Sequence, residues 1–121
     1  MSSKKTCPCC GHKTLSEPPG SYEICKVCFW EDDPVQLLDP SFSGGANLPS
    51  LMECQANYAE FGVSEQRFLD KVRPPKAGEE HDPFWRPATA IDVQAARAPK
   101  DLTDEESRLL STWHYWLRNV A

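Results

Sequence analysis

The sequence lacks a long apolar run, and its first residues do not resemble a secretory signal peptide. No stretch approaches the ~18 apolar residues that a membrane-spanning helix needs. Residues 1–6 carry charge, but no apolar run follows them. We therefore expect a soluble protein of the cytoplasm without membrane contact, and stable disulfides are not expected in that compartment.

Positive charge is also in deficit. Thirteen Lys and Arg residues stand against eighteen Asp and Glu residues, so the formal net charge is −5. Because nucleic-acid binding depends on Lys and Arg contacts with phosphates, we expect no general binding of DNA or RNA. The sequence has no Gly-x-Gly-x-x-Gly motif, no phosphate-binding loop and no His with an obvious nucleophile and orienting residue. We assign no catalytic residue and expect no enzymatic activity.

The 121 residues include eleven prolines, which exclude long uninterrupted elements through the middle of the chain. This length suits one compact domain, or a small metal-stapled unit with an added segment. Apolar residues make up 40% of the chain, so the core should be small and a metal would contribute much of its stability.

Cysteine, in contrast, occurs in a strong pattern. Five of the six cysteines lie within the first 28 residues, and four of these five form two Cys-x-x-Cys turns separated by fourteen residues. Each turn points two sulfurs inward, and two turns together make a closed tetrahedral site. The spacing predicts one structural zinc ion ligated by Cys7, Cys10, Cys25 and Cys28. With four thiolates and one zinc ion, the net charge would be about −7.

Other arrangements of the cysteines stay open. Cys9 is adjacent to Cys10, so a shifted ligand set, a thiol beside the site or a free thiol are all compatible with the spacing. A redox Cys-x-x-Cys usually opens a helix after a strand, a context that is absent here. His12 is a conceivable alternate ligand, although a solvent-facing role is the simpler interpretation. Cys54 is interpreted as a small buried residue of a helix.

Four motifs carry a family resemblance: CPCCG, SYEIC-x-x-CFWEDD, GGAN and NY-x-x-FG. With them, residues 6–76 resemble the bacterial cysteine-rich CPCC domain. The resemblance implies a fold and brings little biochemistry. Lys26 stands where the family pattern leads us to expect proline, a change that alters the stiffness of the turn and not its ligands. We divide the chain into a cysteine-rich zinc-binding domain, 1–76, and a C-terminal extension, 77–121.

The first domain is expected to be a small α+β unit of the zinc-ribbon kind. Residues 13–16 and 21–24 are β-prone and flank the turn residues Pro18 to Gly20, so they predict a β-hairpin that joins the two cysteine turns. Acidic residues 31–33 could bind a metal or a cation, but a carboxylate-capped helical turn is favoured. Residues 39–47 are predicted to form a loop with a structural glycine turn.

Two helices are expected after that loop, and further elements in the extension. Ser50 and Glu53 form a capping box for a helix that ends at Gly62, and Ser64 is predicted to cap a shorter helix through Val72. Residues 76–83 are interpreted as a linker or a surface crossing with a solvated charge run, residues 84–87 as an aromatic patch that packs back, and residues 88–98 as a weak helix. A capping box at Thr103 begins an amphipathic helix, whose apolar stripe contains Leu109, Leu110, Trp113, Trp116, Leu117 and Val120.

The pattern as a whole predicts a zinc-stapled module that binds another protein. Since the acidic residues cluster at 31–33, 79–82 and 104–106, we expect a basic partner. An antitoxin-like or immunity-like role, in which the acidic surface covers a basic toxin, is one specific form. A redox- or metal-responsive protein that uses Cys9 with Cys7 or Cys10 is the alternative, and a nucleic-acid-binding zinc ribbon is the third candidate.

Overall fold

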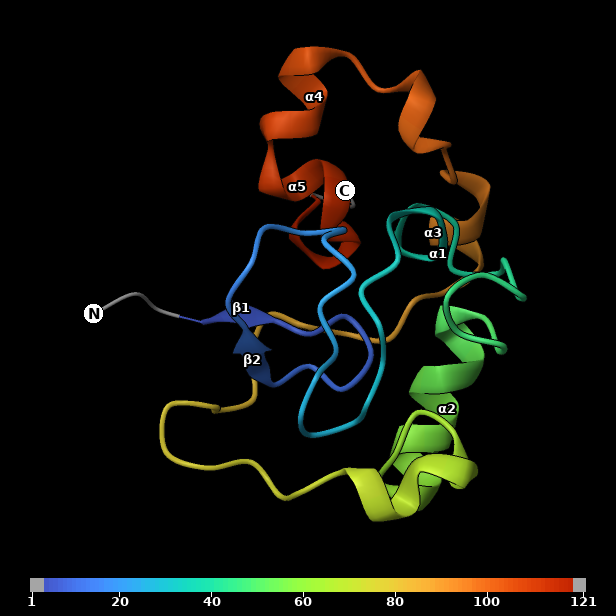
Figure 1. Ribbon diagram of the computed structural model, residues 1–121. Helices are drawn as coiled ribbons and strands as arrows, with labels where there is room; N and C mark the ends of the chain where they lie inside the picture. The colour runs from blue at the N-terminus through green and yellow to red at the C-terminus, as the bar shows by residue number, and fades with distance from the viewer. Residues whose placement is uncertain (1–3, 119–121) are drawn as a thin grey trace.

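Each cysteine turn lies inside its own short antiparallel ladder. The computed structural model describes residues 4–118. Strands β1 (Lys5–Thr6) and β2 (Lys13–Leu15) pair around the first turn (Figure 1). Around the second turn, residues 22–25 pair with residues 30–32 through backbone hydrogen bonds and a bridge between Ile24 and Glu31. The α+β class of the zinc-ribbon kind is thus confirmed.

The predicted pairing of residues 13–16 with residues 21–24 is wrong. Pro18 and Pro19 have no N–H to donate, and Tyr22 has a φ of 65°, which interrupts an extended strand. The connection is held by a side chain instead, because the Glu23 carboxylate accepts hydrogen bonds from the backbone N–H groups of Ser16 and Glu17.

Helices α1 (Pro34–Leu38) and α2 (Leu51–Phe61) follow the second cysteine turn. The Asp33 side chain caps α1, as expected for a carboxylate-capped turn. Ser50 and Glu53 form the predicted capping box of α2, and Gly62 ends the helix with a φ of 78°. Between the two helices, the side chain of Gln36 donates to the carbonyl groups of Phe42, Asn47 and Pro49, which confirms a structural loop.

The next element is a 3-10 helix, η1 (Gln66–Lys71), and not a helix capped by Ser64. Its N-cap is Glu65, which makes no capping hydrogen bond. Ser64 is fully buried, and its backbone N–H donates to the carbonyl of Cys28. Ser64 therefore ties the end of α2 to the second cysteine turn.

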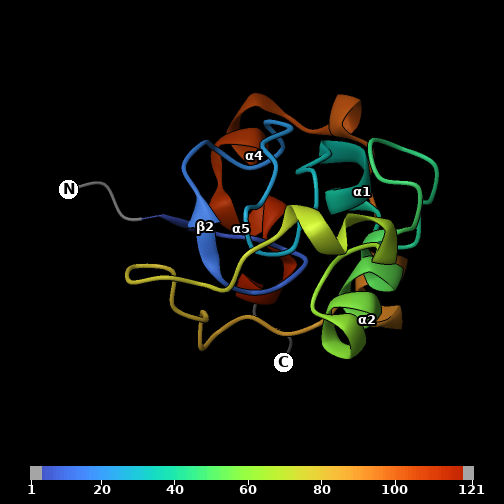
Figure 2. The ribbon, with the colours of Figure 1, turned by 60° about the horizontal axis from the view of Figure 1, so that its bottom comes forward.

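The segment from 76 to 83 packs against the first cysteine turn, so it is the surface crossing and not a free linker, and Glu79 and Asp82 of its charge run are buried. The backbone N–H of Lys13 donates to the carbonyl of Glu80, and that of Asp82 donates to the carbonyl of Gly11. Figure 2 shows this segment, in yellow, passing beside β2. Glu79 is 1% exposed and forms an ion pair with Arg73. Phe84 remains 75% exposed, but Trp85 packs on the core as predicted.

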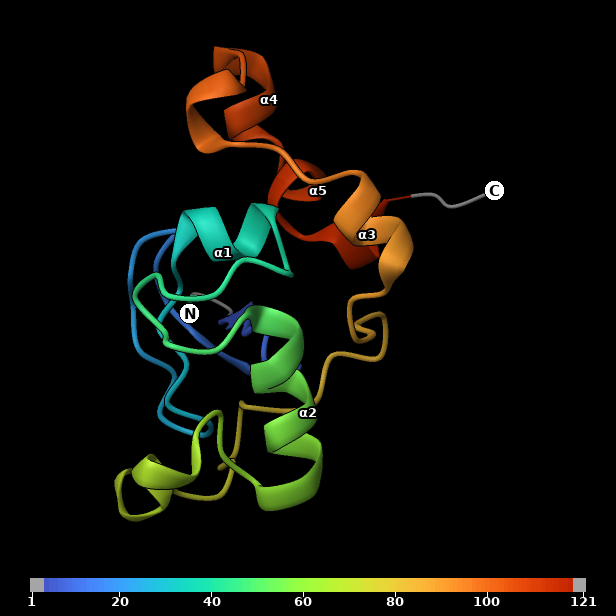
Figure 3. The same ribbon diagram turned by 90° about the vertical axis from the view of Figure 1, so that its right-hand side faces the viewer.

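Short helices make up the rest of the extension. They are α3 (Ala90–Gln94), η2 (Pro99–Asp101), α4 (Asp104–Arg108), α5 (Leu110–Trp113) and η3 (Tyr115–Leu117). The capping box at Thr103 is confirmed. The views in Figure 1 and Figure 3 agree that α4 lies at one end of the molecule and α2 at the other.

The single amphipathic helix predicted after Thr103 is wrong. Leu109 has extended backbone angles, φ −89° and ψ 124°, and separates α4 from α5. As a consequence, His114, Tyr115 and Trp116 are buried, whereas Leu109 and Leu110 are 49% and 45% exposed. Val120 lies outside the described residues.

One apolar core runs through the molecule and includes residues from both sides of position 76. Its buried members outside the cysteines are Leu15, Val27, Trp30, Leu37, Leu51, Ala88, Tyr115 and Trp116. The cysteine turns are part of this core and are not appended to it. Within residues 4–118, no helix has the length and apolar character needed to span a membrane.

Candidate metal centre

The two cysteine turns have the same backbone construction. In the first, the N–H of Gly11 donates to the carbonyl of Cys7 at 2.9 Å, and in the second the N–H of Phe29 donates to the carbonyl of Cys25 at 2.8 Å. Each turn is left through a positive φ, 80° at Gly11 and 70° at Phe29. Phe29 thus adopts the left-handed conformation that a glycine adopts in the first motif, and this conformation strains the backbone of a residue with a side chain.

The four cysteines at the ends of these turns meet at one point. The Sγ atoms of Cys7 and Cys28 are 3.7 Å apart, and those of Cys10 and Cys25 are 3.8 Å apart. All four lie within 4.8 Å of one another. A tetrahedral zinc site with Zn–S bonds of about 2.3 Å has sulfur–sulfur edges of about 3.8 Å, so the observed spacing fits a metal ion. None of these cysteines forms a disulfide.

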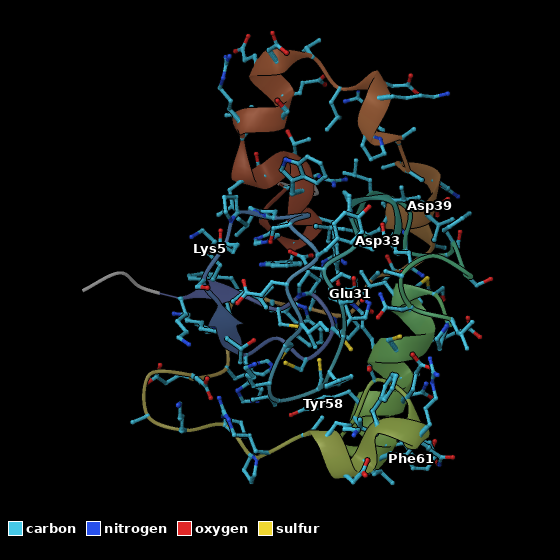
Figure 4. All side chains as sticks on the ribbon, in the orientation of Figure 1. Lys5, Glu31, Asp33, Asp39, Tyr58 and Phe61 are labelled. Atoms are coloured by element: carbon cyan, nitrogen blue, oxygen red, sulfur yellow. The ribbon has the colours of Figure 1, made fainter. Side chains whose placement is uncertain are left out.

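The site is closed to solvent. Its four cysteines are 0–1% exposed, and Trp30 is fully buried in the same cluster. Figure 4 shows sulfur atoms gathered near the middle of the molecule. Four sulfur ligands complete a tetrahedron and leave no position for water or substrate, which is the arrangement of structural zinc sites.

The electrostatics of the site favour a cation. Burial raises the pKa of Cys7 and of Cys28, because a lone thiolate is poorly solvated there. Hydrogen bonds from the other three thiols of the site, that of Cys10 first, lower the pKa of Cys25. Four thiolates at this separation would repel each other strongly. A bound divalent cation deprotonates coordinating thiols and neutralises that repulsion.

Two further groups contact the sulfur of Cys25. The hydroxyl of Thr14 lies 3.0 Å from Sγ, and the backbone N–H of Val27 donates to Sγ at 3.4 Å. Donors of this kind orient a metal-binding thiolate and spread its charge. Thr14 was not identified from the sequence, although its place three residues after Gly11, in the strand that leaves the turn, was a usable signal.

Cys9 and Cys54 are outside the group of four, and both are fully buried. Cys54 is the small buried residue of α2 that the pattern predicted. Beside Cys9, the carbonyl of Pro8 accepts hydrogen bonds from Gln55 Nε2 and from Trp85 Nε1, both at 2.9 Å. These contacts fix the first turn, and the sequence did not reveal them.

The other candidate ligands have structural roles. His12 is half-buried, and its Nδ1 lies 2.9 Å from the carbonyl of Glu79, so it does not simply face solvent. In the acidic triplet 31–33, Asp33 caps α1 and also accepts from the N–H of Ala46. Asp32 accepts from the N–H of Gly20, and burial raises the pKa of Asp32 to about 7. Among the described residues, the four cysteines form the one group placed to hold a metal.

Comparison with known protein families supports this account. A family model described as Cysteine-rich CPCC matches residues 5–79, a stretch that contains all six cysteines. No curated protein matches the chain.

Proposed function

The chain belongs to the cysteine-rich CPCC family, and we propose that it is a protein-binding module held together by one structural zinc ion. Cys7, Cys10, Cys25 and Cys28 would hold the ion, which supplies cross-linking and charge neutralisation when bound. The observation that carries the proposal is the tetrahedral spacing of four buried sulfurs. Because such a site has no open position, the metal has no role in catalysis.

One argument supports a soft metal such as zinc at the site, and two further arguments disfavour a redox role and a nucleic-acid-binding role. Thiolate sets of this geometry select zinc or iron–sulfur chemistry over hard cations. Cys9 is fully buried, whereas reactive thiols are partly exposed, so the redox- or metal-responsive alternative is disfavoured. The net charge of −5 disfavours the nucleic-acid-binding ribbon.

A titration with cobalt tests the metal assignment. Co²⁺ in a tetrahedral thiolate site absorbs strongly in the visible range, and one equivalent per chain should saturate the signal. Cys9→Ser should leave the absorption unchanged, while Cys10→Ser should abolish it or shift its wavelength. The opposite pattern would show that Cys9 is the ligand.

The partner that we propose is a basic protein, with an antitoxin-like or immunity-like role as its most specific form. Asp32, Asp33, Glu79 and Asp82 are buried and contribute little to an exposed acidic face. The net charge of −5 and the exposed Asp101 and Glu105 support the proposal. Charge complementarity of this type mainly raises association rates.

Cross-linking in cells would supply candidate partners for purification. Binding of a purified basic partner should slow with added salt, and Glu105→Lys should slow it further. Salt-independent binding would contradict an electrostatic surface, and tight binding to random DNA or RNA would replace the proposal.

A further inference from the structure

An apolar groove crosses the surface between the turn at Pro18 and Pro19, which we call the proline turn, and helices α4 and α5, which are separated at Leu109. Its cavity volume is about 490 Å³, and its lining residues are Lys5, Pro18, Pro19, Ser107, Arg108, Leu109, Leu110 and Trp113. We refer to it as the Leu109 groove. Figure 4 shows Lys5, the first residue of β1, below the end of the molecule that carries α4 and α5.

The groove is held open by the fold. The extended conformation at Leu109 turns two leucines outward that a continuous helix would have placed in its buried stripe. On the opposite wall, a Cβ at Gly20 would lie 2.9 Å from Cβ of Pro34 and 3.5 Å from the ring of Trp113, so the chain approaches closely there. The indole N–H of Trp113 donates to the carbonyl of Ser107. The close approach at Gly20 thus places the turn after Pro19 next to Trp113, and the hydrogen bond to Ser107 holds Trp113 on its own side of the groove.

The charges next to the groove are of both signs. Asp104 and Arg108 are four residues apart in α4 and therefore share a face. Both are exposed, and neither forms an ion pair with any residue from 4 to 118. Lys5 likewise has no acidic partner in this part of the chain, and its Nζ lies 3.4 Å from the carbonyl of Ser16. A basic or an acidic partner would match only one of these signs.

We propose that a second copy of this chain covers the Leu109 groove. Two-fold symmetric dimers need a surface patch that is complementary to itself. If two α4 helices meet antiparallel, Arg108 of each copy faces Asp104 of the other, and the exposed leucines of each copy meet the groove of its twin. An apolar centre with a charged rim is the usual composition of such an interface.

The surface available indicates a weak dimer. A stable interface buries about 800 Å² per partner, and the whole chain exposes 6887 Å². The groove must be joined by the neighbouring surface of α4 and the proline turn to reach that area. We therefore expect a dissociation constant of about micromolar or weaker. The inference extends the proposed interaction role, but it depends on neither the metal nor the basic partner.

Sedimentation velocity over a concentration series tests the dimer on the zinc-loaded full chain. The wild type should shift from monomer to dimer as the concentration rises. Arg108→Asp and Asp104→Arg should each weaken association at least tenfold, because like charges then face each other. Lys71→Asp, which changes an exposed cation in η1, should have no effect.

A mixture of the two charge variants provides the decisive arm. Arg108→Asp and Asp104→Arg together restore both opposite-charge contacts, so the mixture should dimerise within about threefold of the wild type. Unchanged circular dichroism of Arg108→Asp confirms that this variant is folded. A protein that stays monomeric at all concentrations would overturn the proposal, as would a dimer insensitive to Arg108→Asp or a mixture that does not associate. Cobalt binding would be unaffected by any of these results, so the metal assignment is tested separately.

Discussion

The hydroxyl of Thr14 lies 3.0 Å from the sulfur of Cys25, deep inside the cluster of thiols. Thr14 is 3% exposed, so its hydroxyl has little access to water. In a metal-loaded site the hydroxyl can donate to the thiolate and hold it toward the ion. The proposed centre therefore depends on more than its four ligands.

Replacing Thr14 with valine should weaken metal binding with little change in shape. We expect Thr14→Val to lower the zinc affinity by about tenfold, the lower end of the range for residues that orient metal ligands. Competition with a chromophoric chelator measures the change. Thr6→Val is the matched control, because the Thr6 hydroxyl donates to Asp82 and not to a sulfur. Equal losses in both variants would show that Thr14 acts only through general stability.

The buried carboxylate of Asp32 should make stability depend on pH. Its pKa is raised to about 7, first by desolvation and further by the charges of Glu23 and Asp33, against hydrogen bonds from Gly20 and Ser21 that lower it. In the unfolded chain the pKa of an aspartate is about 3.9. The stability linked to Asp32 is therefore fully present below pH ~3.9 and is lost as the pH rises through about 7.

Asp32→Asn removes this dependence. We expect the variant to exceed the wild type in free energy of unfolding at pH 8 by about 2–4 kcal/mol, and the difference should shrink toward pH 5. Urea unfolding of the zinc-saturated proteins at several pH values measures it. Asp101→Asn, at an exposed position, controls for a general effect of charge. Parallel pH curves for the wild type and Asp32→Asn would contradict the assignment.

The residues that could be predicted from the sequence are those whose interactions are local. The cysteine spacing and the capping boxes at Ser50 and Thr103 depend on neighbours within a few residues, and the structure contains them. Thr14 and Gln55 act through partners 11 and 47 residues away. No short pattern identifies such contacts.

At the scale of the elements, the C-terminal segment shows the limit of periodicity. The apolar spacing after Thr103 favours one long helix, but the chain is extended at Leu109 and again at His114, with φ −93° and ψ 93°. Those breaks let Tyr115 and Trp116 reach the core together. Tertiary packing thus outweighs the local preference for a continuous helix.

The hydroxyl of Tyr115 connects three parts of the chain. It donates to the carbonyl of Arg86 at 2.6 Å and accepts from Gln55 Nε2 of α2 at 2.9 Å. We expect Tyr115→Phe to lower the free energy of unfolding by about 1–3 kcal/mol, because it leaves buried polar groups unpaired. Urea denaturation measures the loss. Tyr22→Phe, at a side chain 51% exposed, should change stability little, and equal effects would contradict the role of Tyr115.

The strand pairing was mispredicted for a related reason. β-propensity marked residues 21–24 as a strand, yet propensity does not specify the partner of a strand. In the structure each cysteine turn closes its own ladder, so the segments that flank one turn pair with each other. The segment that connects the two turns is held instead by the carboxylate of Glu23, which accepts hydrogen bonds from its backbone.

At the scale of the whole molecule, the cysteine cluster and the C-terminal aromatics share one core. Metal binding should therefore stabilise regions far from the ligands in sequence. Removing zinc with a strong chelator should abolish amide protection in residues 7–30 and also weaken it around residues 113–117. Hydrogen exchange measured by mass spectrometry resolves both regions. Unchanged protection in the metal-free protein would show that the core stands without the ion.

The central claim, that four cysteines hold one structural zinc ion, is tested most directly by metal stoichiometry. Native mass spectrometry and elemental analysis of gently purified protein should find one zinc ion per chain. The same measurement should find one zinc ion in Cys9→Ser and none in Cys10→Ser. Stoichiometric iron, or a folded wild-type protein without bound metal, would contradict the account.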